Sequence, residues 1–193
     1  SSLTQPFSYN NVKINYGGGS QWKTPGHWIT WEIDVPETGF YNLGLKYRQG
    51  YLDGLFSSRK IYIDEEVPFA ELNAVRFEYS SGWKNKILGD ENGAYSIYLT
   101  EGKHYIRMEN VIGDMTSTMS VLSAVIADLN RLYLSVVMIT GADPDQYRDY
   151  DIAKQLPKLS EELLVNSKLL ADEAKRLETT VGTKGAENAY FED

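Results

Sequence analysis

Apolar and polar residues alternate along the first half of the chain, a pattern that is typical of β-strands with one buried face. The first clear run covers residues 28–35. A turn with proline and glycine follows at residues 36–39, and a second alternating run covers residues 40–48, so the two runs are expected to form a hairpin. Shorter alternating runs lie at residues 12–16, 60–64, 95–99 and 104–109. Short strands joined by glycine turns predict an antiparallel β-sandwich.

The periodicity changes after residue 114, where apolar residues recur every three or four positions. This spacing predicts a helix over residues 118–140, ended by Gly141, and a second helix that begins near Ile152 or Pro157. The second helix has an apolar stripe, which predicts antiparallel pairing with the first. The stripe consists of Leu159, Leu163, Asn166, Leu170, Ala174 and Leu177. The charged residues expected on its solvent side are Glu161, Glu162, Lys168, Asp172, Glu173, Lys175 and Arg176.

The first helix is long enough to cross a bilayer, at about 1.5 Å per residue, but its middle is polar. Asp128, Asn130 and Arg131 lie there, and each charge at that depth costs about 2.5–3.5 kcal/mol on an insertion scale. The sequence therefore predicts no membrane span. Because apolar residues also lie outside the main stripe, this helix is expected to be buried on two sides. These residues are Val121, Leu134, Val137 and Met138.

Composition divides the chain at the same place as the periodicity. Of the 16 glycines, 13 lie in residues 1–114, together with all four tryptophans. We therefore expect a β-rich α+β fold with a β-sandwich in residues 1–114 and an antiparallel helical hairpin with a polar tail in residues 115–193. Two helices alone make a poor core, so the hairpin needs the sandwich, a third helix or another part of a longer protein.

Charge and residue content exclude several classes of function. The net charge of −8 disfavours nucleic acid as a partner, because an acidic protein repels phosphate groups. The lack of cysteine excludes disulfides, thiolate zinc sites and a cysteine nucleophile. An acidic group between the helices could hold calcium, but it lacks the glycine and the bidentate glutamate of a calcium loop, which favours helix N-capping by Asp143 or Asp151. This group consists of Asp143, Asp145, Asp149 and Asp151.

The sequence contains no catalytic motif that we can identify. The two histidines, His27 and His104, are not at metal-ligand spacing, and His104 is expected in a turn or in the core. Glu32 and Asp34 share a strand face that is expected to be exposed to solvent, whereas a catalytic carboxylate needs a perturbed environment. The chain is therefore predicted not to be an enzyme. A glycoside hydrolase fragment stays open as an alternative, which requires two carboxylates about 5–10 Å apart in a cleft.

Aromatic residues outside the strand pattern are the best candidates for ligand binding. Four of them are out of phase with the predicted core or lie in loop-like stretches, and planar polar side chains lie nearby in the sequence. They are Trp22, Trp28, Tyr51 and Trp83, with Arg48, Gln49 and Asn85 as polar partners. A pyranose has an apolar C–H face that stacks on a ring, and hydroxyls that need planar donors and acceptors. These residues form the predicted carbohydrate site; alternatively, the rings cover the sandwich ends or dock the helices.

Three segments of the first half carry a resemblance to a known fold. They are W-E-I-D-V-P-E-T-G-F-Y-N-L-G-L-K-Y at 31–47, R-K-I-Y-I-D-E-E-V-P-F at 59–69 and Y-L-T-E-G-K-H-Y-I-R-M at 98–108. This pattern resembles the galactose-binding-like jelly-roll sandwich of carbohydrate-binding module families 6 and 35, which implies carbohydrate binding. Those modules usually open with an E-A-E-like strand that helps to hold a structural calcium. The present chain opens with S-S-L-T-Q-P-F instead, so no cofactor is expected.

A second resemblance concerns the segment M-I-T-G-A-D-P-D-Q-Y-R-D-Y-D at residues 138–151. It is similar to the helical segment of large extracellular solute-binding lipoproteins of Gram-positive ABC transporters. This implies a non-catalytic carbohydrate-binding domain of a sugar-uptake protein, extracellular and attached to the cell surface through the remainder of that protein. The expected partners are an oligo- or polysaccharide and that remainder. The alternative, motivated by the two-faced helix, is a structural or protein-docking module that binds no sugar.

Overall fold

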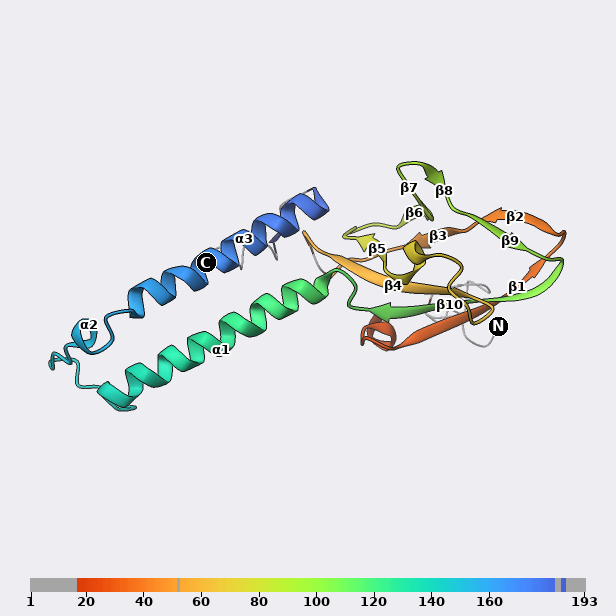
Figure 1. Cartoon of the computed structure of the whole chain (residues 1–193). Helices are drawn as coiled ribbons and strands as arrows, with labels where there is room; N and C mark the ends of the chain where they lie inside the picture. The colour runs from red at the N-terminus through yellow and green to blue at the C-terminus, as the bar shows by residue number, and fades with distance from the viewer. Residues whose placement is uncertain (1–16, 52, 183–184, 187–193) are drawn as a thin grey trace. The chain divides into compact units, whose positions relative to one another are not determined.

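The computed structural model describes residues 17–51, 53–182 and 185–186, and Figure 1 shows the order of the elements. The chain divides into two compact units, one of residues 1–52 and 56–114 and one of residues 53–55 and 115–193. The strand predicted at residues 12–16 lies outside the described residues. Two 3-10 helices belong to the first unit, η1 (Gly19–Trp22) before the first strand and η2 (Ala70–Asn73) after the fourth.

A four-stranded antiparallel sheet forms one layer of the first unit, in the order β1-β10-β4-β5. Its strands are β1 (Trp28–Val35), β10 (Gly102–Val111), β4 (Phe56–Ile63) and β5 (Val75–Glu78). The alternation fixes the register, because Met108 of β10 lies opposite Ile61 of β4 and both side chains are buried. The residues that alternate with these buried ones along β4 and β10 face the other side of the sheet.

A second layer is built from short paired strands. β2 (Gly39–Asn42) pairs with β9 (Ser96–Leu99), β3 (Gly44–Tyr47) pairs with β6 (Lys84–Ile87), and β7 (Gly89–Asp90) and β8 (Gly93–Ala94) form a small hairpin. The apolar core between the two layers consists of Val35, Ile61, Ile63, Leu72, Val75, Phe77, Leu88, Ile97, Leu99, Ile106 and Met108. The first unit is therefore an antiparallel β-sandwich, as predicted.

The hairpin predicted between the runs 28–35 and 40–48 is wrong. β1 pairs with β10, and the chain crosses to the other layer at residues 36–38, where β2 pairs with β9. Alternation predicts which face of a strand is buried, but it does not say which strand lies beside it. Crossing between the layers lets both runs point their apolar faces into the same core.

The side chain of His104 is on the core-facing side of β10 and links the turn at Asp64 with the turn at Thr100. Its Nδ1 lies 2.5 Å from Asp64 Oδ2, and its Nε2 lies 2.8 Å from the carbonyl oxygen of Thr100. Both partners accept hydrogen bonds, which favours the doubly protonated ring. The hydrogen bond with Asp64 accordingly raises the pKa of His104 above its ordinary value of 6.5.

The raised pKa of His104 predicts a pH-dependent stability of the sandwich. The stabilisation is fully present below pH 6.5, the ordinary pKa, and is lost as the pH rises through the raised value. We expect the His104→Asn variant to lack this part of the pH dependence. Urea unfolding between pH 5 and 9, followed by tryptophan fluorescence, measures it. Parallel curves of unfolding free energy against pH for the two proteins would contradict the assignment.

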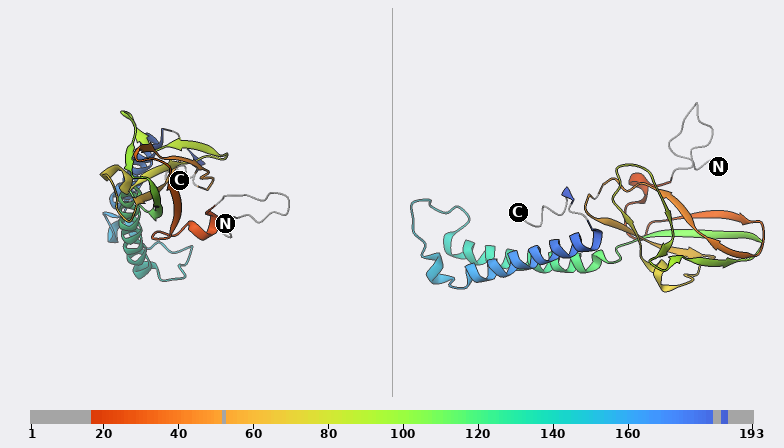
Figure 2. Two further views of the ribbon diagram at one scale, coloured as in Figure 1. Left: turned by 90° about the vertical axis from the view of Figure 1, so that its right-hand side faces the viewer. Right: turned by 90° about the horizontal axis from the view of Figure 1, so that it is seen from above.

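The second unit is an antiparallel pair of long helices, α1 (Met115–Thr140) and α3 (Leu159–Val181), joined by a loop that contains the short α2 (Ile152–Gln155). The two long helices run along each other, as Figure 1 and the right view of Figure 2 show. Gly141 and Gly182 follow them in the left-handed conformation that ends a helix, each with φ of 78°. The predicted helical hairpin, and with it the fold class, is confirmed.

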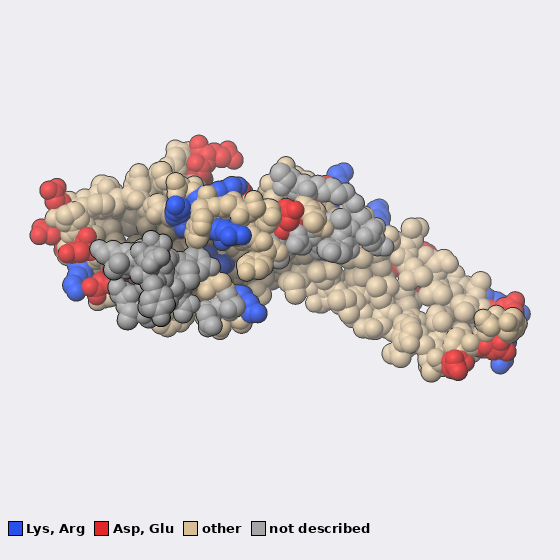
Figure 3. All heavy atoms as spheres, turned by 180° about the vertical axis from the view of Figure 1, so that it is seen from behind, with Lys and Arg blue, Asp and Glu red and all other residues tan. Residues whose placement is uncertain are grey.

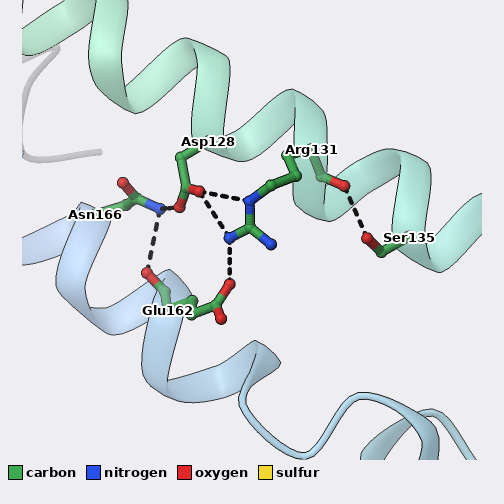
Figure 4. A network of polar contacts seen from close by, with 5 residues as sticks. All are labelled: Asp128, Arg131, Ser135, Glu162 and Asn166. Carbon is green, nitrogen blue, oxygen red and sulfur yellow. Dashed lines mark hydrogen bonds and ion pairs between the residues drawn. The ribbon is translucent and has the colours of Figure 1, made fainter.

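Polar side chains fix the register of the two helices at their middle (Figure 4). Asp128 accepts hydrogen bonds from Asn166 at 2.7 Å and from both Nε and Nη2 of Arg131, and Arg131 also forms an ion pair with Glu162. The hydrogen bonds from Asn166 and Arg131 lower the pKa of Asp128. Because each partner lies on a defined turn, a slip of one helix along the other would break the network.

A second polar contact lies nearer the start of α1. Arg176 donates to both carboxylate oxygens of Glu173 and, at 2.8 Å, to Thr118 Oγ1. Glu173 and Thr118 are buried and Arg176 is half-buried, so the prediction that Glu173 and Arg176 lie on the solvent side is wrong. Hydrophobic spacing cannot identify such a pair, because a buried carboxylate becomes acceptable only through its partner.

The structure corrects two further predictions, one about N-capping by an aspartate and one about the burial of α1. Asp151 is the N-cap residue of α2, but its side chain forms no capping hydrogen bond. Within the described part of the chain, α1 is buried on one side rather than two: Val125 and Leu132 are buried, whereas Leu134 and Met138 are exposed. By length and composition alone, α1 could cross a membrane. The absence of a span stays a prediction.

Candidate functional site

The residues predicted to bind carbohydrate lie at one end of the sandwich. Trp28 is the first residue of β1 and lies opposite Glu109, near the last residue of β10. In the other layer, Tyr47 ends β3 and lies opposite Lys84, which begins β6. The ring centres of Tyr47, in this layer, and Phe77, in β5 of the four-stranded sheet, are 4.9 Å apart. The ends of the two layers therefore lie together at one end of the sandwich. Trp22, Arg48, Gln49, Tyr51, Trp83 and Asn85 belong to the segments that continue from these strand ends.

Three of the predicted residues lie in or directly beside the β3–β6 ribbon. Asn85 lies directly opposite Lys46. The ladder ends at the pair Tyr47–Lys84, and Arg48 and Trp83 are the residues that directly follow β3 and directly precede β6. Arg48, Trp83 and Asn85 are all exposed and belong to this end of the ribbon.

The loops that follow this ribbon are tied together by backbone and side-chain hydrogen bonds. The Ser80 amide donates to the Gln49 carbonyl at 2.7 Å, and the Ser80 hydroxyl donates to the Gly82 carbonyl. The Tyr51 amide donates to Gln49 Oε1 at 2.9 Å. These bonds hold the loop of Tyr51 beside the loop that leads to Trp83, so both rings start from anchored backbone.

The outer face of the four-stranded sheet forms a second aromatic group around Trp28. The Arg107 guanidinium lies 4.0 Å from the ring centre of Tyr62 and 6.0 Å from that of Trp28. Arg107 also pairs with Glu65 at 3.0 Å, and the Tyr62 hydroxyl donates to Glu109. The side chains of this face are therefore partly fixed by cation–π contacts and ion pairs.

Trp22 differs from the other three predicted rings because it is half-buried and packs on the core of the sandwich. Its ring meets that of Trp31 edge to face at 6.2 Å, and its Nε1 donates to the His27 carbonyl. The Arg59 guanidinium lies 4.5 Å from its ring centre, and burial lowers the pKa of Arg59 to about 10. Trp22 thus contributes an anchored edge to this end of the sandwich rather than an open platform.

Accessibility separates the predicted residues into two kinds. Tyr51 is 85% exposed, Trp28 58% and Trp83 50%, so three rings are open to a ligand at the same end of the fold. The residues missed by sequence reasoning are Tyr62, Arg107, Arg59 and Trp31. Alternation does put residues 62 and 107 on outward faces, but their meeting with Trp28 follows from the pairing of β10 with both β1 and β4.

Carboxylates of the sandwich act as partners of basic groups. Glu32 accepts from Lys103 at 2.6 Å and from the Tyr105 hydroxyl at 3.1 Å, and the contact with Lys103 lowers its pKa. Burial raises the pKa of Asp64, but the hydrogen bonds from Tyr105 and His104 outweigh it and the pKa is lowered. A general acid needs the opposite shift. Among the described residues, no group of three or more His, Asp or Glu side chains could hold a metal ion.

The helical hairpin is the part of the chain with a family match. Residues 117–192 match the family model of the bacterial solute-binding protein, 4-helix bundle domain. The match covers fewer than half of the residues of the chain and includes α3 and nearly all of α1. A search of the curated proteins finds no match.

Solved structures resemble part of the chain. A Paenibacillus sp. cycloisomaltooligosaccharide glucanotransferase shares 27% identity with a TM-score of 0.38, and the likeness covers 50% of this chain but 14% of that one. A family 35 carbohydrate-binding module from Clostridium thermocellum shares 17% identity over 52% of this chain and 73% of that one, with a TM-score of 0.37. A family 35 module from an environmental isolate shares 13% identity over 46% and 58%, with a TM-score of 0.36.

Proposed function

We propose that the sandwich is a non-catalytic carbohydrate-binding module of an extracellular solute-binding protein. The observation that carries the proposal is the presence of three exposed rings, Trp28, Tyr51 and Trp83, at one end of the fold. Each can lie against the apolar face of a sugar ring. Arg48, Gln49 and Asn85 are the planar polar groups that would hydrogen-bond to the hydroxyls.

The setting of the module is inferred from the helical hairpin. The match of residues 117–192 to a domain of bacterial solute-binding proteins supports a role beside a solute receptor. The segment at residues 138–151 resembles lipoproteins of ABC transporters, which favours sugar uptake and attachment to the cell surface through the rest of a larger protein. In this setting the sandwich would keep a glycan close to the receptor. Weak single contacts suffice there, because a polysaccharide offers many copies of the same epitope.

The proposal predicts that the exposed rings carry the affinity for a glycan. Each of the variants Trp28→Ala, Tyr51→Ala and Trp83→Ala is expected to lose about 1 kcal/mol of binding free energy, roughly a fivefold weaker Kd, through loss of stacking area. A glycan array on the 193-residue protein identifies the ligand, and isothermal titration calorimetry on that ligand measures the change.

Tyr98→Ala is the matched control for these variants. Tyr98 is an exposed tyrosine as well, but it lies opposite Phe40 of β2, at the other end of the sandwich. Its removal is expected to leave the affinity unchanged. A silent array over plant and microbial glycans, or equal losses from Tyr98→Ala and Tyr51→Ala, would reject the proposed site.

One observation favours a second candidate function, a docking module without sugar binding. Ile126 and Tyr133 of α1 and Leu164 of α3 are large apolar side chains that are exposed on the hairpin. Exposed apolar surface of this extent is typical of an interface with another protein segment. Binding to a receptor part of the larger protein combined with a silent glycan array would favour this alternative.

A further inference from the structure

Basic side chains gather on the paired strands β3 and β6, which carry no acidic ones. Lys46 lies in β3, Lys84 and Lys86 lie in β6, and Arg48 directly follows β3. The chain as a whole has the opposite balance, with 27 acidic residues against 19 basic ones. Lys46, Arg48, Lys84 and Lys86 are named the basic patch below.

The pairing of the two strands brings these cations close together. Lys46 lies opposite Asn85, which Lys84 and Lys86 flank on β6. Alternation directs Lys46 to one face of the pair and the two lysines of β6 to the other. Among the described residues, β6 pairs with β3 alone, so a polymer that follows its open edge passes side chains from both faces. Figure 3 shows basic side chains gathered on one part of the sandwich, apart from most acidic side chains of that face.

None of the four cations of the basic patch forms an ion pair within the part of the chain that the structure describes. The basic residues of β10 show the contrast. Lys103 lies 2.6 Å from Glu32, and Arg107 lies 3.0 Å from Glu65. Three members of the basic patch are exposed and Lys86 is half-buried. The described carboxylates therefore leave the positive charge of the basic patch available to an anionic partner.

Exposed aromatic rings lie beside these cations. Trp83 directly precedes Lys84, and Tyr51 lies in the loop that follows Arg48. A ring can stack on the apolar face of a sugar while an ammonium or guanidinium group pairs with a charged substituent of the same glycan. Nucleic acid fits less well, because its dense phosphate charge would meet the many acidic groups of the rest of the protein. Rings next to unpaired cations thus favour a charged glycan.

We infer that the basic patch binds an anionic polysaccharide, in which carboxylate or phosphate groups supply the charge. The inference rests on the proposed function, and it names the class of glycan that the rings of Tyr51 and Trp83 would hold. Lys46, Lys84 and Lys86 are specificity-determining residues in this inference, because a neutral glycan offers no charge for them to pair with.

Removing the charge of the three lysines tests the inference. The triple variant is Lys46→Gln, Lys84→Gln and Lys86→Gln, and the double variant without position 86 replaces it if the triple variant does not fold. The matched control removes the same number of charges from exposed positions of the second unit: Lys154→Gln, Lys168→Gln and Lys175→Gln. Isothermal titration calorimetry measures the binding of each 193-residue protein to polygalacturonate, to phosphomannan and to neutral dextran.

The wild type is expected to bind at least one of the two charged polymers and to bind dextran more weakly, and the polymer that it binds identifies the charged group. At about 0.1 M salt the triple variant should bind that polymer roughly tenfold more weakly, since exposed ion pairs are lost, while the control is unchanged. Raising the salt to about 1 M shortens the Debye length from about 10 to about 3 Å and should weaken the binding of the wild type.

Three outcomes would overturn the inference: no binding to either charged polymer, equal binding to dextran, or equal losses from the triple variant and the control. The fate of the proposed function can be read separately. A neutral glycan that binds and is weakened by Trp83→Ala but not by the triple variant would reject the basic patch and keep the carbohydrate site. A protein that binds no glycan of any kind would reject both.

Discussion

Replacing Ile61 with alanine is expected to lower the free energy of unfolding of the sandwich by about 4 kcal/mol. Ile61 has no exposed surface and lies in β4, an inner strand of the four-stranded sheet, opposite Met108 of β10. The substitution removes apolar carbons from the core and leaves a cavity between two sheets, which the paired strands cannot close without losing hydrogen bonds. A loss of this size is a large part of the stability of a small domain.

Tryptophan fluorescence during urea unfolding measures this effect on the sandwich alone, because all four tryptophans lie in residues 1–114. Ile87→Ala removes the same side chain from an exposed position of β6 and is the matched control. It should change the unfolding free energy by less than about 0.5 kcal/mol. A similar shift in both variants would show that the layer containing Ile61 is not the core of the fold.

The hairpin is expected to lose about 3 kcal/mol of stability when Arg176 is replaced with methionine. Arg176 holds both carboxylate oxygens of Glu173, whose side chain is almost fully buried. The variant leaves that carboxylate without its cation. The hydrogen bond from Arg176 lowers the pKa of Glu173, so the contribution of this pair is present above pH 4.5, the ordinary pKa, and is lost as the pH falls through the lowered value.

Circular dichroism at 222 nm during thermal unfolding follows the helices in this experiment. The double variant Glu173→Gln, Arg176→Met should recover part of the loss, since a neutral amide is less costly to bury than an unpaired carboxylate. The difference between the wild type and Arg176→Met should also shrink below pH 4.5. A double variant less stable than Arg176→Met alone would show that Glu173 is stabilised by other groups.

Hydrophobic patterning predicted β1, β4, β9, β10 and the two long helices at least in part, because burial on one face leaves a periodic trace in the sequence. It missed β5 and β6, and it predicted one strand where β2 and β3 are separate. The predicted run 28–35 coincides with β1, and the helix predicted at 118–140 is α1 with a slightly earlier start. The pairing of the strands could not be predicted in this way. β1 pairs with β10, far along the chain, rather than with the run 40–48 that follows it. Both of these segments have the same apolar–polar alternation, so the pattern cannot distinguish them as partners.

The candidate site was predictable to a similar extent. Trp28, Tyr51 and Trp83 stood out because each is out of phase with the core or lies in a glycine-rich loop, and the structure leaves all three exposed. Trp22 could not be separated from them by sequence, since its half-burial results from packing on the core and from the ring of Trp31. Arg107 and Tyr62 were missed because their cation–π contact joins two neighbouring strands, β10 and β4, whose pairing the sequence pattern does not predict.

The position of β10 between β1 and β4 has a consequence for how the protein is made. β10 is the last strand of the sandwich to leave the ribosome, yet both β1 and β4 need it as their neighbour in the sheet. β1 and β4 must therefore wait with unpaired edges while the intervening residues are synthesised, and closing such distant contacts is slow. The helical hairpin pairs segments close in sequence and is under no such constraint, so it is expected to reach its native state soon after its own residues are synthesised.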